Sequence, residues 1–192
     1  MTLVQGTHSP IGDKKEGTAL QGDTPPTTYE GEITMGLDIT AYKKLVKVEN
    51  PKLDADGELE DYENQWQTDG SMKWSERHWP GRAEGLEFGT VYIYGESLGF
   101  RAGSYSGYNL WRKMLSDFAE ANAFQELIEF SDCEGVIGPV VSAKLAKDFT
   151  DYEERARKYA DTFERGEWWI EKYQEWKEAF QLAADGGAVD FH

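Results

Sequence analysis

Four segments of the chain carry the apolar pattern of β-strands: 35–42, 90–100, 124–130 and 188–191. In the first two, apolar and polar positions alternate with a period of two, which is typical of a strand with one buried face. The segment 124–130 is short and apolar, so it fits a helix or a strand, and we expect a strand. The last segment predicts a short edge strand. The apolar positions are Leu37, Ile39, Ala41, Val91, Ile93, Leu127, Ile128, Phe130, Val189 and Phe191.

Apolar residues three and four positions apart predict three helices. The first begins after a cap at Ser106 or Asn109. A long second helix begins at Pro139, because a first helical residue does not need the N–H group that proline lacks. A third begins near Gly166 and ends at the glycine pair 186–187. The last two should pack as an antiparallel hairpin. The stripes are Trp111, Met114, Leu115 and Phe118, then Val141, Leu145, Phe149, Tyr152, Ala156, Tyr159 and Phe163, then Trp169, Tyr173, Trp176, Phe180 and Ala183.

These elements predict a single α+β domain over residues 35–192. In it, a small and mostly antiparallel sheet packs against three helices, including the C-terminal hairpin. Residues 1–34 are rich in Gly, Thr, Pro and Ser and have almost no periodic apolar pattern. Such a segment cannot bury enough apolar surface to offset the entropy lost on ordering. We therefore expect residues 1–34 to form a flexible N-terminal tail.

The chain is strongly acidic, with a net charge of -16. The segment 49–70 contains eight acidic residues and a single lysine. Nonspecific binding to nucleic acid requires clustered lysine and arginine, so we expect no direct contact with nucleic acid. An acidic surface can instead maintain solubility, hold cations, dock on a basic protein or imitate DNA.

The sequence gives no sign of export or membrane insertion. No apolar run approaches the roughly 18 residues that span a bilayer, and the N-terminus lacks the basic and apolar regions of a signal peptide. The single cysteine, Cys133, cannot form an internal disulfide. We expect a cytoplasmic protein without membrane contact, and the pattern does not indicate an oligomeric state.

The stretch 100–109 is the first candidate for a ligand site, because a glycine- and serine-containing loop joins the predicted strand to the predicted helix. Backbone N–H groups, hydroxyls and an arginine at such a junction suit a small anionic ligand. A second polar loop, 131–135, also precedes a helix, and a pocket between the two loops would combine their side chains. The alternative is that the arginine forms an internal ion pair while the glycines only allow tight turns. The candidate ligand-binding residues are Arg101, Ser104, Ser106, Asn109, Asp132 and Glu134.

The sequence gives weaker support to two other kinds of site, a catalytic cysteine and a metal site. Cys133 could act as a nucleophile with His192 or His78 as base, but the adjacent carboxylates disfavour the thiolate, and a buried inert cysteine is the better interpretation. A site for a hard metal ion lacks a ligand pair with helical spacing. We therefore predict no catalytic residue, no metal and no cofactor. The metal ligands considered are Asp38, Asp132, Glu134, Asp190 and His192.

Four motifs in order resemble a family of small hypothetical proteins of phages and prophage-bearing bacteria. They lie at 35–42 (MGLDITAY), 100–109 (FRAGSYSGYN), 130–138 (FSDCEGVIG) and 186–192 (GGAVDFH). The resemblance covers 35–192 and implies a mobile-element setting, without an activity or a cofactor.

Together with the acidic charge and the many tryptophans, the resemblance favours a non-enzymatic accessory protein. Such a protein would bind a host protein through an acidic, aromatic surface, with inhibition of a defence or DNA-binding system as one outcome. The alternative is a protein that binds or sequesters a nucleotide or other anion, or a small hydrolase, with its site at 101–109 and 131–135. A phage structural or assembly component is a third interpretation.

Overall fold

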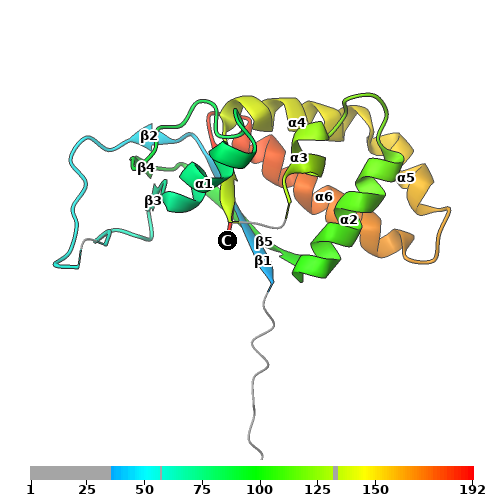
Figure 1. Ribbon diagram of the computed structural model, residues 1–192, viewed down its shortest axis with the longest axis horizontal. Coiled ribbons are helices and arrows are strands. Elements are labelled where there is room, and N and C mark those ends of the chain that lie inside the picture. The colour runs from blue at the N-terminus through cyan, green and yellow to red at the C-terminus, as the bar shows by residue number, and fades with distance from the viewer. Residues whose placement is uncertain (1–35, 57, 132–133) are drawn as a thin grey trace, which may run out of the picture. The chain divides into compact units, whose positions relative to one another are not determined.

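The computed structural model describes residues 36–56, 58–131 and 134–192 (Figure 1). The strands are β1 (Leu37–Lys43), β2 (Val46–Lys47), β3 (Gln65–Gln67), β4 (Val91–Ile93), β5 (Glu96–Gly103), β6 (Gly135–Ile137) and β7 (Ala188–Phe191). The helices are α1 (Gly70–His78), α2 (Tyr105–Phe118), α3 (Gln125–Glu129), α4 (Pro139–Asp151), α5 (Glu153–Ala160) and α6 (Gly166–Ala183).

The main sheet has the strand order β5-β1-β7-β6, and every neighbouring pair is antiparallel. In its register Ile39 lies opposite Phe191, and Thr40 lies opposite Asp190. Because side chains alternate along a strand, one face of the sheet carries the apolar members of these pairs and the other face carries the polar members. The two faces therefore have different chemistry.

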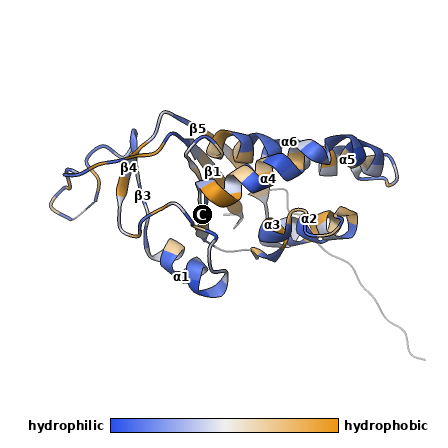
Figure 2. Ribbon diagram, turned by 90° about the horizontal axis from the view of Figure 1, so that it is seen from above, coloured by the Kyte–Doolittle hydropathy of each residue, from blue (hydrophilic) through white to orange (hydrophobic). Residues whose placement is uncertain are grey.

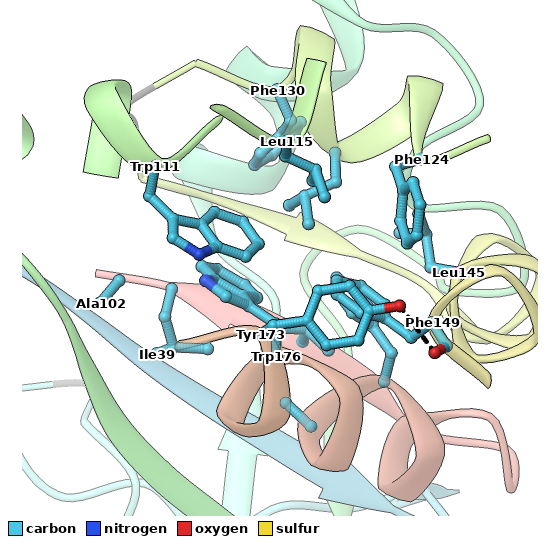
Figure 3. Close-up of a cluster of buried hydrophobic side chains, with 14 of the residues drawn as sticks. Ile39, Ala102, Trp111, Leu115, Phe124, Phe130, Leu145, Phe149, Tyr173 and Trp176 are labelled. Carbon is cyan, nitrogen blue, oxygen red and sulfur yellow. Dashed lines mark hydrogen bonds between the residues drawn. The ribbon is translucent and has the colours of Figure 1, made fainter. Parts of the chain in front are cut away.

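The apolar face packs against the helices through an aromatic core (Figure 3). Trp176 of α6 is at its centre and is 1% exposed. Its ring centroid lies 5.0 Å from that of Phe100, 5.7 Å from that of Trp111 and 5.5 Å from that of Phe191. The hydroxyl of buried Tyr173 donates to the carbonyl of Phe149 at 2.8 Å, so this polar group is satisfied inside the core.

A second layer covers part of the polar face. It consists of the small antiparallel sheet, in the order β2-β4-β3, together with α1. Trp66 of β3 is 8% exposed, and its ring lies 5.0 Å from that of Tyr42 and 6.1 Å from that of Tyr92. The second core lies between the two sheets and consists of Trp66, Met72, Ala83, Tyr92, Val136 and Ala188.

The structure confirms the α+β class and the helical hairpin at the C-terminal end. The segment that begins at Pro139, predicted to be one long helix, is divided at Tyr152 into α4 and α5. Tyr152 packs its ring against Phe118 and Phe124, at centroid distances of 5.9 and 5.4 Å. The predicted N-terminal tail lies outside the described residues.

Three expectations about single elements were wrong. The segment 124–130 contains the short helix α3 rather than a strand, because Phe124, Leu127 and Phe130 recur every three residues and are all fully buried. The strand β7 is central rather than an edge, because β6 pairs with its other side. The segment 90–100, expected to be one strand, is divided between β4 of the small sheet and β5 of the main sheet. The helix α1, capped by Asp69, was not predicted.

None of the described helices is both long enough and apolar enough to cross a lipid bilayer.

Replacing Trp176 with alanine should lower the free energy of unfolding by about 3–5 kcal/mol, because it leaves a large cavity among the aromatic rings of the main core. The matched control is Trp74→Ala, since Trp74 of α1 is 42% exposed. This control should lower the free energy of unfolding by about 1 kcal/mol or less. Urea unfolding followed by circular dichroism measures both changes, and equal losses would contradict the assigned core.

Candidate functional site

Arg101 and Asp38 form an ion pair between neighbouring strands. Arg101 Nη1 donates to Asp38 Oδ2 at 2.9 Å and to Oδ1 at 3.1 Å, and the two residues are opposite each other in the β1–β5 register. The guanidinium also lies over Gly36, where an added Cβ would come within 2.0 Å of Nη2. The arginine predicted to receive an anion therefore already has a carboxylate partner, as the alternative interpretation expects.

The other polar residues of the first loop stabilise helix α2. Ser104 is the N-cap of this helix, and its Oγ accepts from the N–H of Gly107 at 3.1 Å. Ser106 Oγ lies 3.1 Å from Ser104 Oγ, and Asn109 Oδ1 accepts from Arg112 Nη2 at 2.6 Å. Capping satisfies N–H groups that the first helical turn leaves unpaired. The serine and asparagine side chains of this loop therefore have hydrogen-bond partners within the loop and helix α2.

The second predicted loop is described only in part, because Asp132 and Cys133 lie outside the described residues. The hypothesis of a pocket between the two loops and the interpretation of Cys133 as a buried, inert cysteine therefore remain predictions. Helix α2 does contact the segment before this loop, since the hydroxyl of Tyr108 donates to the carbonyl of Phe130 at 3.0 Å. Of the described residues predicted to bind a ligand, only Glu134 lines a cleft on the polar face of the main sheet.

A cleft of about 260 Å³ lies on the polar face of the main sheet, beside the start of α1. Its three acidic side chains come from separate segments of the chain: Asp69 caps α1, Glu134 precedes β6, and Asp190 belongs to β7. Among the described residues, none of the three forms an ion pair, and no lysine or arginine lines the cleft. The lining consists of Trp66, Gln67, Asp69, Ser71, Glu134, Val136, Asp190, Phe191 and His192.

Asp190 is the deepest of the three carboxylates. Its neighbours Val189 and Phe191 point into the aromatic core, so strand alternation places Asp190 on the opposite, polar face. Its Oδ2 accepts a hydrogen bond from Trp66 Nε1 at 3.0 Å. Burial raises the pKa of Asp190 to about 6, and this rise is opposed by the Trp66 hydrogen bond and by nearby His192.

Two neighbours of Asp190 are held in place by hydrogen bonds. The Nε2 atom of His192 lies 2.9 Å from Thr40 Oγ1, and its backbone pairs with that of Asp38 in both directions. Asp69 Oδ1 accepts from the N–H of Ser71 at 2.8 Å and from its hydroxyl at 2.5 Å. The cleft is therefore organised before any ligand binds.

The arrangement suits an organic cation. Several carboxylate oxygens can each accept a charge-assisted hydrogen bond from an ammonium or guanidinium group. Within the described part of the chain, no three His, Cys, Asp or Glu side chains are arranged to hold a metal ion. His78 lies outside the cleft, where its Nδ1 is 2.9 Å from the carbonyl of Trp74.

Sequence reasoning found Glu134 and considered Asp190 and His192 only as metal ligands. It missed Trp66 and Asp69 as site residues. The alternation of Val189 and Phe191 with Asp190 and His192 signals a polar strand face, and aspartate is a typical N-cap residue at the start of a helix such as α1. The approach of Trp66 to Asp190, which are 124 positions apart, has no signal in a single sequence.

Comparison with protein-family models, curated proteins and solved structures finds no match for this chain.

The raised pKa of Asp190 predicts a specific pH dependence of stability. A carboxyl group whose pKa is higher in the folded protein binds its proton more tightly there, so protonation stabilises the fold. The contribution of Asp190 is therefore complete below about pH 4 and is lost as the pH rises to about 6. The free energy of unfolding should fall over this range, by up to about 3 kcal/mol more in the natural protein than in Asp190→Asn.

Urea unfolding of both proteins at half-unit pH steps measures this difference. Glu153, whose pKa is lowered to about 2 mainly by its hydrogen bonds with Lys177 and Arg157, titrates at lower pH and contributes equally to both proteins. Parallel stability curves for the two proteins between pH 4 and 6 would contradict the burial of Asp190.

Proposed function

We propose that this chain is a non-enzymatic binding protein whose acidic cleft receives a cationic side chain of a basic partner protein. The observation that carries the proposal is the convergence of Asp69, Glu134 and Asp190 on one cleft, whose described lining contains no lysine or arginine. Elsewhere, many acids of the described chain have basic partners, as in the pairs Lys113–Asp117 and Lys144–Asp148. The cleft acids are therefore available to a partner.

The shape of the cleft supports a side chain as the ligand. A volume of about 260 Å³ has room for the stem and head of a lysine or arginine. The indole of Trp66 is fixed between two tyrosine rings, and its N–H orients the Asp190 carboxylate. Groups that are ordered before binding lose little conformational entropy on binding, which increases affinity.

The charge of the cleft disfavours an anion as its ligand. A phosphate would face three carboxylates, and the nearby arginine, Arg101, already pairs with Asp38. A nucleotide-binding protein or a small hydrolase at this position would need positive groups, and His192 is the only side chain of the described lining that can carry a positive charge. The geometry therefore favours a cationic ligand over a nucleotide.

The expected phage setting extends the proposal to a host protein as partner. Proteins that bind nucleic acid carry basic surfaces, and a highly acidic protein can compete for such a surface. Under this proposal, the acidic cleft binds the basic surface of a host protein that binds nucleic acid or acts in defence, and thereby inhibits that protein.

Defined peptides test the proposal directly. Blocked hexa-arginine and hexa-lysine peptides should bind saturably, whereas hexa-glutamate should not. Asp190→Asn should weaken binding of the basic peptides at least tenfold, because it removes the buried charged acceptor of a charge-assisted hydrogen bond. Isothermal titration calorimetry at two salt concentrations measures the affinities, and higher salt should weaken binding.

The matched control is Glu171→Gln, which removes one charge from exposed Glu171 on α6. Its affinity should stay within about twofold of that of the natural protein, because α6 packs on the apolar face of the main sheet. Equal effects of the two substitutions would mean that binding depends only on the net charge, and would refute the cleft as the binding site. Binding of a nucleotide that is lost in Arg101→Ala would instead support the anion site.

A further inference from the structure

We infer that the partner segment also inserts an apolar side chain into a groove on the outer face of the small sheet, adjoining the acidic cleft. This inference rests on the proposed function and specifies its partner: an extended, basic segment that carries an aliphatic side chain near its cationic one.

The register of the small sheet separates its two faces. Trp66 lies opposite Tyr92, and both are buried against the main sheet. The neighbouring positions must point the other way, away from the main sheet. One such row consists of Val46, Ile93 and Gln65, and another places Gln67 opposite Val91.

A groove of about 300 Å³ lies on this outer face. Its apolar lining is formed by Val48, Pro51, Leu53 and Val91. The polar side chains of the lining include Gln67, Glu49 and Lys47, and Lys47 is paired with Glu87 at 2.7 Å. Gln67 also lines the acidic cleft, so the two hollows share a residue. A single extended segment can therefore reach both.

Exposed apolar side chains lie in this groove and on the same face of the small sheet. Leu53 of the lining is 45% exposed and Val91 is 4% exposed, while Val46 and Ile93, which belong to the neighbouring row, are 63% and 46% exposed. Figure 2 shows β4 as a hydrophobic strand among largely hydrophilic neighbours. Apolar residues gathered at one place on a polar surface are typical of a docking site.

The charges beside the groove specify the chemistry of the partner. The connection from β2 to β3 forms one border of the groove, and its acids are exposed and form no ion pairs within the described residues. With a net charge of -16 on the whole chain, a second copy would be repelled, whereas a basic segment would be attracted. The exposed acids are Glu49, Asp54, Asp56, Glu58, Glu60, Asp61 and Glu63.

Blocked peptides with two arginines followed, after one to four glycines, by leucine test the inference. The matched peptides have serine in place of the leucine. At the best spacing, the leucine peptide should bind the natural protein about tenfold more tightly than its serine counterpart, because a buried leucine adds apolar contact. This preference should disappear in Leu53→Ser, because Leu53 lines the groove at an exposed position.

The control substitution is Leu110→Ser, because Leu110 of α2 is 44% exposed and lies outside the groove. It should keep the full preference for leucine. Asp190→Asn should weaken the leucine and serine peptides to the same extent, which separates the cleft from the groove. Titrations followed by NMR chemical shifts cover the weak affinities expected for short peptides.

The outcomes distinguish this inference from the proposed function. If the leucine and serine peptides bind equally at every spacing while Asp190→Asn still weakens both, the groove is refuted and the cleft stands. If no peptide binds, both are refuted. A dimer that dissociates on Leu53→Ser, without any preference for leucine peptides, would assign the groove to a second copy and overturn the inference.

Discussion

The hydrogen bond from Trp66 Nε1 to Asp190 Oδ2 joins the small sheet to the main sheet, and the cleft depends on it. Trp66 fixes the small sheet by packing between Tyr42 and Tyr92, while Asp190 belongs to the central strand β7. The same contact keeps a carboxylate at the base of the cleft, where burial raises its pKa to about 6. One interaction therefore links the packing of the two layers to the charge of the site.

A buried carboxylate is costly, so the surrounding fold must hold it in place. The strand that carries it supplies this support, because Val189 and Phe191 on either side of Asp190 are fully buried in the aromatic core. Moving Asp190 out to solvent would require both apolar neighbours to leave the core. The stability of the main core is therefore used to maintain a polar group in an unfavourable position, as is common at binding sites.

Local periodicity was sufficient to predict the α+β class, the aromatic stripes of the helices and the strand β1, because each depends on neighbours along the chain. The position of β7 could not be predicted, since a four-residue strand gives no indication of what pairs with each side. The candidate site divides in the same way. Arg101 and Ser104 are close in sequence and attracted attention, yet their polar groups stabilise the local fold through Asp38 and helix α2. The cleft combines Asp69, Glu134 and Asp190, which only the tertiary structure brings together.

The distribution of ion pairs adds a reason why a partner would approach from the side of the small sheet. On the helices many acids are neutralised locally, for instance Glu153 by Lys177 and Arg157, and Glu154 by Lys158. The acids between β2 and β3 and those of the cleft have no such partners in the described structure. On this face, acids without local cations therefore lie beside exposed apolar side chains. Long-range attraction would guide a basic segment to this face, and short-range apolar contact in the groove would then select among basic segments.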